Sequence, residues 1–413
     1  MFSEETLFIL GAGASWYYGY PLGKDLIHSI IHTISSEHVY VPLTSEQRAR
    51  VGFDASSLND MRFSLHYISE QLKNIDVKNI PDGDDQFFQI NPNHVLANMG
   101  QTGIVPTSSM LASVKMSQIE EFSALKNALK LFDPVSIDAF LNHHQSHALA
   151  GKVMIVYALL KCEDPAAFMM GYARKPKPWE VSISKDVQDD NWYSYLLADI
   201  MAGCVNPDDI VNNNLKIITF NYDMSLDCIL HEKLSNVEMF KDDGIAKNYF
   251  DDLVLNKIHH VYGKLYKEAS QDVYGLHQVK PSNQDARTNT IRLVQALNSS
   301  DQIKLINDRL LAHKDGFYKS LIEQAKKIIV IGFGFDRDNL DVLGFPSQPD
   351  GYNGMFKGKE LLYMDYDGRM RGLAEQFGYL TKRFDFRASR SAATRITDAY
   401  QNDFKIRLFQ DIT

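Results

Sequence analysis

Short apolar runs recur along the chain, and each of the first four is followed by glycine or polar residues. Runs of this length that are rich in Ile, Val and Leu are typical of strands buried on both faces of a sheet. They cover residues 7–10, 215–220, 327–333 and 360–364, and residues 257–262 are a further short strand candidate. We therefore predict five strands, with polar residues at the carboxyl ends of the first four.

Elsewhere, apolar residues recur at the three- and four-residue spacing of an amphipathic helix. Within residues 24–35 they are Leu26, Ile27, Ile30, Ile31 and Ile34. Further helices are predicted near residues 60–73, 118–132, 136–141, 148–160, 192–202, 291–312, 369–377 and 391–406. Strands that alternate with helices predict an α/β protein with a parallel, doubly wound sheet.

The first two predicted strands are separated by about 200 residues, which is too long for a simple connecting loop. We therefore expect a mostly helical insertion over residues 36–210, with residues 1–35 and 211–413 forming the core that contains the sheet. A chain of 413 residues is long enough for about two to three domains of roughly 150 residues each.

Charge and cysteine content exclude several classes of protein. The net charge of −9 argues against broad, nonspecific binding of nucleic acid. The three cysteines, Cys162, Cys204 and Cys228, are far apart and suggest neither a disulfide framework nor a metal site. The first apolar run is too short for a signal peptide or a membrane span. We expect a cytoplasmic protein that uses no metal.

Candidate binding residues follow the predicted strands, where ligands bind in open α/β sheets. A loop of small residues lets a diphosphate approach the backbone, and free amides at a helix start attract it. The groups are Gly11, Ala12, Gly13 and Ser15 with Gly19 and Pro21; Thr219, Asn221 and Asp223; His259, His260, Tyr262 and Gly263; and Gly332, Gly334, Asp336 and Asn339.

These groups, in this order, resemble the sirtuin family, and most closely its zinc-free NADases of bacterial antiphage defence. The family's Gly-Ala-Gly-x-Ser loop is matched at residues 11–15, its Gly-x-Pro at 19–21 and its Thr-x-Asn-x-Asp at 219–223. Its late Gly-aromatic-Ser-Phe-x-Asp-x-Asn segment is similar to residues 332–339, where Gly334 replaces the usual Ser. The resemblance implies a sirtuin-type Rossmann-like sheet.

The chain departs from the family at the catalytic position, where a His-Gly pair is replaced by Tyr262-Gly263. On a strand, His260 faces the same side as Tyr262, whereas His259 faces the other side. An unperturbed His, with a pKa near 6.5, suits a general base better than a Tyr, with a pKa near 10. Three explanations stay open: His260 takes over the role, the alignment slips locally, or the site is impaired.

The resemblance implies hydrolysis of NAD, as substrate, to ADP-ribose and nicotinamide, serving abortive antiphage defence. Asn221 would orient the ribose or the attacking water, supported by Asp223, and His260 or Tyr262 would accept a proton. Gly11, Ala12, Gly13 and Ser15 would hold the diphosphate, and Gly332, Gly334 and Asn339 would lie along the adenosine half. Three cysteines cannot build the four-cysteine zinc module of the protein deacylases.

Such enzymes need control, and the family suggests a homo-oligomer and a HerA-type ATPase partner. The alternative function is a catalytically impaired subunit that binds NAD or ADP-ribose for regulation or as a scaffold. Protein deacylation and ADP-ribosyl transfer rank third. The aromatic residues Trp16, Tyr17, Tyr18 and Tyr20 could stack on a ligand ring or pack inside the protein, and the sequence leaves both open.

Overall fold

The computed structural model describes residues 2–40, 62–73, 86–90, 112–115, 119–162, 191–240, 256–265, 286–306, 316–346, 354–364, 387–391 and 395–408. The chain forms two compact units. Unit 1 comprises Met1–Tyr20, Pro165–Lys264 and Lys304–Thr413, and unit 2 comprises Pro21–Asp164 and Leu265–Ile303. The chain therefore leaves unit 1 and returns to it twice.

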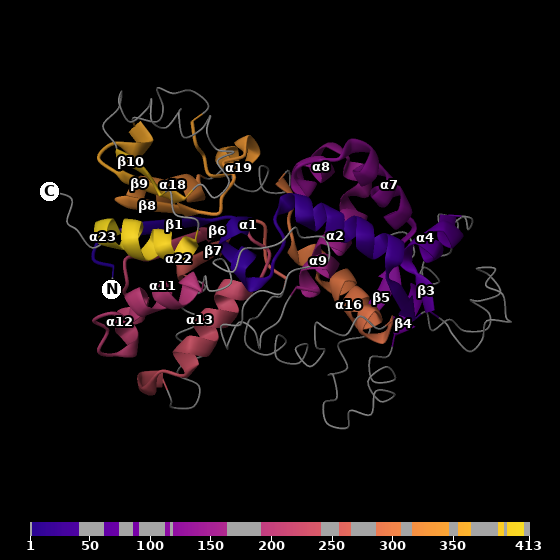
Figure 1. Cartoon of the computed structure of the whole chain (residues 1–413), viewed down its shortest axis with the longest axis horizontal. Helices are drawn as coiled ribbons and strands as arrows, with labels where there is room; N and C mark the ends of the chain where they lie inside the picture. The colour runs from indigo at the N-terminus through magenta and orange to yellow at the C-terminus, as the bar shows by residue number, and fades with distance from the viewer. Residues whose placement is uncertain are drawn as a thin grey trace. The chain divides into compact units, whose positions relative to one another are not determined.

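Unit 1 is built on a six-stranded sheet in which every neighbouring pair is parallel. Its strands are β1 (Thr6–Leu10), β6 (Leu215–Thr219), β7 (Ile258–His260), β8 (Lys327–Ile331), β9 (Glu360–Met364) and β10 (Arg387–Ser391). They lie in the order β10-β9-β8-β1-β6-β7 (Figure 1). Counted along the chain this is 6-5-4-1-2-3, the Rossmann order, which confirms the predicted parallel α/β fold.

The order of the strands reverses between β1 and β8. From β1 the chain builds the sheet outward through β6 and β7, and it then crosses to β8 on the other side of β1. Ligands of such sheets bind outside the carboxyl ends of the strands at this switch point. All five predicted strands are present; β10, which lacks a long apolar run, is an additional strand.

Helices cover both faces of the sheet. Phe8 faces Tyr400, with ring centroids 6.3 Å apart, so the C-terminal helices lie on that face. Phe8 pairs with Ile217 and Ile217 with Ile258. The next residue of β7, His259, points to the opposite face, where its ring meets Phe317 of α18. The helical elements of unit 1 are α1 (Ala12–Ser15), η1 (Trp16–Tyr18), α11 (Trp192–Met201), α12 (Pro207–Val211), α13 (Ser225–Ser235), η7 (Glu238–Phe240), α18 (Phe317–Gln324), α19 (Arg337–Val342), α22 (Ile396–Asp398), the π-helix η9 (Ala399–Phe404) and α23 (Lys405–Leu408).

The described part of unit 2 is mostly helical. Its helical elements are α2 (Gly23–Ser36), α4 (Leu65–Lys73), α7 (Phe122–Phe132), α8 (Ile137–His143), η5 (Gln145–His147), α9 (Ala148–Leu160), α16 (Ala286–Ser299) and η8 (Ser300–Gln302). Two antiparallel pairs join β2 (His38–Tyr40) to β3 (Arg62–Ser64) and β4 (Gln86–Ile90) to β5 (Ala112–Lys115). Helix α9 is apolar on all sides and almost entirely buried, as a central helix must be.

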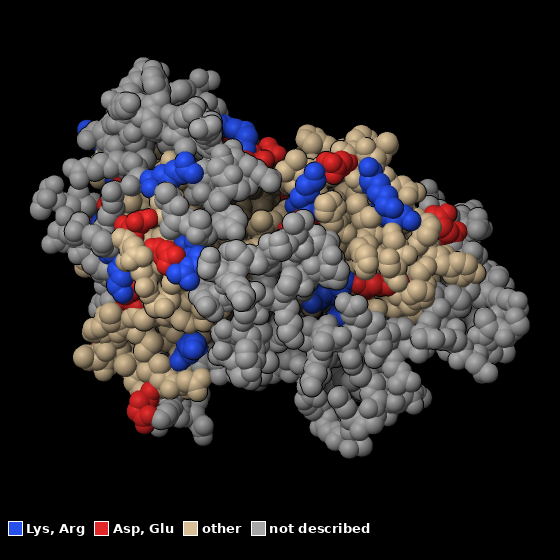
Figure 2. Space-filling model, in the orientation of Figure 1, with Lys and Arg blue, Asp and Glu red and all other residues tan. Residues whose placement is uncertain are grey.

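The units differ from the domains expected from the sequence. Helices α2 and α16 belong to unit 2, whereas α11 and α12, expected in the insertion, belong to unit 1. The helix predicted near residues 369–377 lies outside the described residues. Among the described helices, none is long and apolar enough to span a membrane. On the face in Figure 2, acidic and basic side chains of the described residues lie intermingled.

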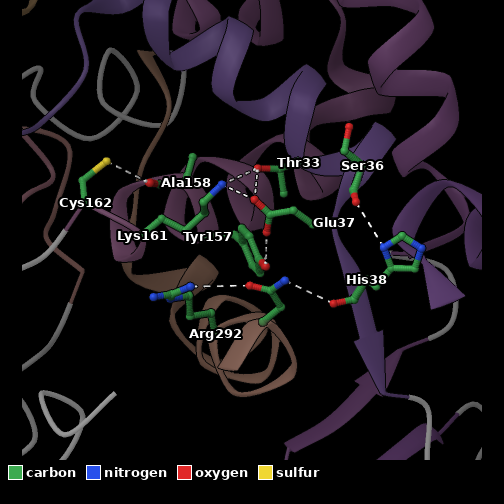
Figure 3. Close-up of polar contacts among 10 residues, drawn as sticks. Thr33, Ser36, Glu37, His38, Tyr157, Ala158, Lys161, Cys162 and Arg292 are labelled. Atoms are coloured by element: carbon green, nitrogen blue, oxygen red, sulfur yellow. Dashed lines mark hydrogen bonds and ion pairs between the residues drawn. The ribbon is translucent and has the colours of Figure 1, made fainter. Parts of the chain in front are cut away.

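Buried polar contacts link the segment that follows α2 to α9 and α16 in unit 2 (Figure 3). The Glu37 carboxylate pairs with Lys161 and accepts a hydrogen bond from the Tyr157 hydroxyl at 2.7 Å. Burial, followed by the Glu37 charge, raises the pKa of Tyr157 well above 10. Asn289 of α16 donates to the carbonyl oxygen of His38 at 3.2 Å. This late segment of the chain is thus attached to β2, the strand that follows the first helix of the unit.

Glu37→Gln is expected to destabilise unit 2, because the nearly buried Lys161 ammonium loses its countercharge. Removing one partner of a buried ion pair costs about 3–5 kcal/mol. The matched control is Lys24→Met, which breaks the exposed Lys24–Asp133 pair of the same unit and should cost at most about 1 kcal/mol. Urea unfolding of the whole chain measures both. Equal losses for the two variants would contradict the role assigned to the network.

Candidate functional site

The loops that follow β1 and β8 touch each other at the switch point. The Gly11 amide donates to the Ile331 carbonyl at 3.0 Å, and the Gly13 amide donates to the Gly332 carbonyl at 3.1 Å. Gly332 has a φ of +62°, a left-handed conformation that glycine adopts without steric cost. The two loops therefore continue the pairing of β1 with β8 beyond the end of the sheet.

This contact leaves no room for side chains on the glycines. A Cβ on Gly13 would lie 2.7 Å from the Gly332 Cα, and one on Gly11 would lie 2.6 Å from the Phe333 Cα. The Ala14 amide donates to the Gly11 carbonyl at 2.9 Å. Close backbone packing therefore accounts for glycine at these positions even without a bound diphosphate. The backbone amides of Gly11, Gly13 and Ala14 already donate hydrogen bonds within the protein.

A second cluster of polar residues joins the β1 loop to the end of β6. The Asn221 side-chain amide donates to the Ser15 hydroxyl at 3.2 Å, and the Asn221 backbone amide donates to the Thr219 hydroxyl at 3.1 Å. Asp223 accepts hydrogen bonds from the Ser225 amide at 3.1 Å and the Ser225 hydroxyl at 2.5 Å. Asn221 and Asp223 are 8% and 6% exposed, so the fold fixes both side chains.

Burial makes the Asp223 carboxylate costly to ionise. It raises the pKa of Asp223 above 3.8, although hydrogen bonds from Ser225 and Ser15 and the charge of His260 act in the opposite direction. Tyr193 of α11 lies in the same environment: burial, followed by the Asp223 charge, raises its pKa well above 10. A buried carboxyl group with a shifted pKa next to polar side chains is typical of a functional site.

The end of β7 supplies His260, which is held on both sides of its ring. Its Nε2 lies 3.0 Å from the Asp227 Oδ2, and its Nδ1 lies 3.3 Å from the Asn221 carbonyl oxygen. Lys264 approaches the other Asp227 oxygen at 3.6 Å. A general base needs a nitrogen lone pair directed at the substrate, so this geometry favours a positioning role for His260.

His259 faces the other side of the sheet, as the strand alternation predicts. Burial, followed by the charges of Lys216 and His260, lowers the pKa of His259 to about 4, so its ring is neutral at neutral pH. Its ring contacts Phe317, and this contact places it away from Asn221 and Asp223.

Tyr262 connects the β7 turn to the segment after β8. Its hydroxyl donates to the Asn339 side-chain oxygen on α19. Phe220 packs between Tyr262 and Phe333, with ring centroids 5.6 and 4.7 Å away. Because β1 and β6 separate β8 from β7 in the sheet, the segment after β8 extends past the carboxyl ends of both strands. Phe335 in this segment has a φ of +50°, a strained conformation for a bulky residue.

The remaining predicted residues occupy simpler positions. Gly19 and Gly263 form turns with φ of +94° and +79°. Gly334 is exposed, and no atom of the described residues lies within 4 Å of the place where its Cβ would be. Asp336 caps α19 by accepting from the Asp338 amide at 3.0 Å. Ala12 opens α1, and Pro21 begins unit 2.

Several residues of the site escaped sequence reasoning. For Asp227 the sequence offers only a weak indication, namely its position four residues after Asp223, at the start of the helix that follows. For Trp192 and Tyr193 the sequence offers no indication of a place in the site, because they come from a helix that was expected in the insertion. The Trp192 indole donates to the Ala14 carbonyl at 2.9 Å, and Tyr193 stacks on Tyr18 with centroids 4.6 Å apart. For Tyr18 the structure thus supports packing inside the protein.

Within the described ranges, no group of three or more His, Cys, Asp or Glu residues could hold a metal ion. The cysteines Cys162, Cys204 and Cys228 are free thiols. Comparison with known proteins identifies no relative: no family model, curated protein or solved structure matches the chain.

Gly13→Ala is expected to destabilise unit 1, because the new methyl group would overlap the Gly332 backbone. Overpacking of this kind costs about 1–3 kcal/mol. Gly334→Ala is the matched control; the site is open and its φ is not positive, so stability should stay equal or rise slightly. Thermal unfolding compares the two. A Gly13→Ala protein as stable as the wild type would refute the contact.

Asp223→Asn is expected to be as stable as the wild type at pH 7, or more stable. The folded chain holds the Asp223 proton more tightly than the unfolded chain, so ionisation of Asp223 lowers the free energy of unfolding as pH rises through its raised pKa. Asparagine keeps an acceptor for Ser225 and carries no charge. The difference between variant and wild type should therefore grow as pH rises from about 4. Urea unfolding at several pH values measures it, and a difference that shrinks with pH would contradict the assignment.

Proposed function

We propose that the protein binds NAD at the carboxyl edge of the sheet and hydrolyses it to ADP-ribose and nicotinamide. The observation that supports this most is the meeting of Ser15, Asn221 and Asp223. They come from two of the ordered motifs shared with the sirtuin-like NADases, and they lie at the switch point of a sheet with Rossmann order.

The reaction breaks the bond between the nicotinamide nitrogen and the ribose. The bonding electrons leave with nicotinamide, positive charge develops on the ribose, and water adds its oxygen to the ribose carbon and releases a proton. Such a reaction needs a fixed ribose and a fixed water more than a strong nucleophile. Asn221 would orient the ribose or the water, and the nearby Asp223 carboxylate would stabilise the developing positive charge.

The diphosphate would lie along the loop from Gly11 to Ser15, and the adenosine half along Gly332, Gly334 and Asn339. The exposed position of Gly334 supports this, since no atom of the described residues fills the space next to it. The setting that the family suggests is abortive antiphage defence in the cytoplasm by a homo-oligomer, with a HerA-type ATPase as partner.

A second candidate function is NAD or ADP-ribose binding without turnover. The specific observation is that the two groups closest to the family's catalytic position are both engaged. Tyr262, which replaces the family's His, donates to Asn339, and both ring nitrogens of His260 face oxygen atoms of Asn221 and Asp227.

The test is release of nicotinamide and ADP-ribose from NAD by the purified chain, alone and with the product of the neighbouring gene. Asn221→Ala should lower the rate about 100-fold or more, because the reacting groups lose their orientation. Asn214→Ala is the matched control: Asn214 is exposed and lies just before β6, at the opposite end of the strand.

Equal rates for Asn221→Ala and the wild type would contradict the assigned site. NAD binding without release under all conditions would favour the binding function. Release that requires an acyl-peptide or an acceptor protein would instead indicate deacylation or ADP-ribosyl transfer.

A further inference from the structure

Asp227 is a buried carboxylate that belongs to none of the recognised motifs. It lies in the first turn of α13, where the helix dipole favours a negative charge. Its side chain is 0% exposed. A fully buried acidic group is retained at such a position only when it is paired and hydrogen-bonded. Its partners therefore indicate its role.

Two basic residues face this carboxylate, one from the end of β7 and the other from the segment that follows it. His260 Nε2 lies 3.0 Å from one oxygen and Lys264 Nζ lies 3.6 Å from the other. Burial alone would raise the pKa of Asp227, but the charges of His260 and Lys264 and the hydrogen bond from His260 outweigh it, so the pKa falls below 3.8. Asp227 is therefore ionised at neutral pH.

The interaction continues from His260 to Asn221. His260 Nδ1 lies 3.3 Å from the Asn221 carbonyl oxygen, on the side of the ring opposite Asp227. The other two polar groups of Asn221 are fixed by Thr219 and Ser15. Loss of the His260 contact would free the peptide bond between Asn221 and Tyr222 to rotate. The Asn221 side chain could then turn away from Ser15.

We propose that Asp227 is a positioning residue, which fixes the His260 ring and, through it, the orientation of Asn221. It touches no reacting atom. The claim about turnover rests on the proposed NAD hydrolysis, whereas the claim about orientation concerns the protein alone.

The first experiment is Asp227→Asn in the full chain. Asparagine has nearly the same volume but lacks the charge that holds His260. We expect kcat to fall about 100-fold, the effect of a displacement of about 1 Å in a reacting group, with KM within about threefold of the wild type. In an Asn221→Ala background, Asp227→Asn should add little, because both changes remove the same orientation.

The matched control is Asp199→Asn. Asp199 is also buried, and it accepts a hydrogen bond from Tyr400 and pairs with Lys405, both at 2.9 Å. A purely structural carboxylate should affect stability without changing kcat. An equal loss of kcat in the two variants, or a full 100-fold loss from Asp227→Asn in the Asn221→Ala background, would overturn the proposal.

A second readout needs no catalysis. In protein labelled with ¹⁵N-asparagine, the side-chain amide signals of Asn221 should move in Asp227→Asn and stay in place in Asp199→Asn. Unmoved signals would overturn the positioning role. If the wild type releases no nicotinamide, the proposed reaction fails while these signals still decide the orientation. Should Asp227→Asn not fold, Asp227→Glu keeps the charge one methylene further out and should show the same pattern with a smaller effect.

Discussion

The backbones that leave β1 and β8 touch at Gly13 and Gly332, and the rest of the candidate site depends on this contact. It holds α1 in place, so that Ser15 can accept the hydrogen bond from Asn221 at the end of β6. It also directs the segment after β8 along the carboxyl edge, where Phe333 packs on Phe220 and Asn339 accepts from Tyr262. One close approach between two glycines thus aligns residues from four strands.

Within this frame, two buried aspartates have opposite environments. Asp223 is surrounded by hydroxyl groups, and burial raises its pKa, whereas the charges of His260 and Lys264 lower that of Asp227. Two carboxyl groups whose pKa values are moved apart typically have different roles in an active site. Asp223 is the one whose ionisation costs stability, which fits a group kept for binding or catalysis, whereas Asp227 stabilises its neighbours.

The sequence predicted five of the six strands of the parallel sheet, because most of them are apolar runs with polar residues after them. It missed β10, whose residues Arg387–Ser391 resemble a surface segment, and the short strands β2 to β5 of unit 2. It also did not place α2 and α16 in unit 2, which depends on packing between distant segments. Of the site, it placed Asn221, Asp223 and the glycines on one edge of the sheet. It could not find Asp227 or Tyr193, since their importance comes from contacts with residues that are remote in sequence or that lie on another element.

A structure of the protein with ADP-ribose would be the sharpest test of the proposed site, because it locates the ligand without requiring turnover. We expect the diphosphate to lie beside the loop between Gly11 and Ser15, with the ribose that would carry nicotinamide next to Asn221 and the adenosine next to Gly334. A ligand bound in unit 2, or along the amino ends of the strands, would contradict it.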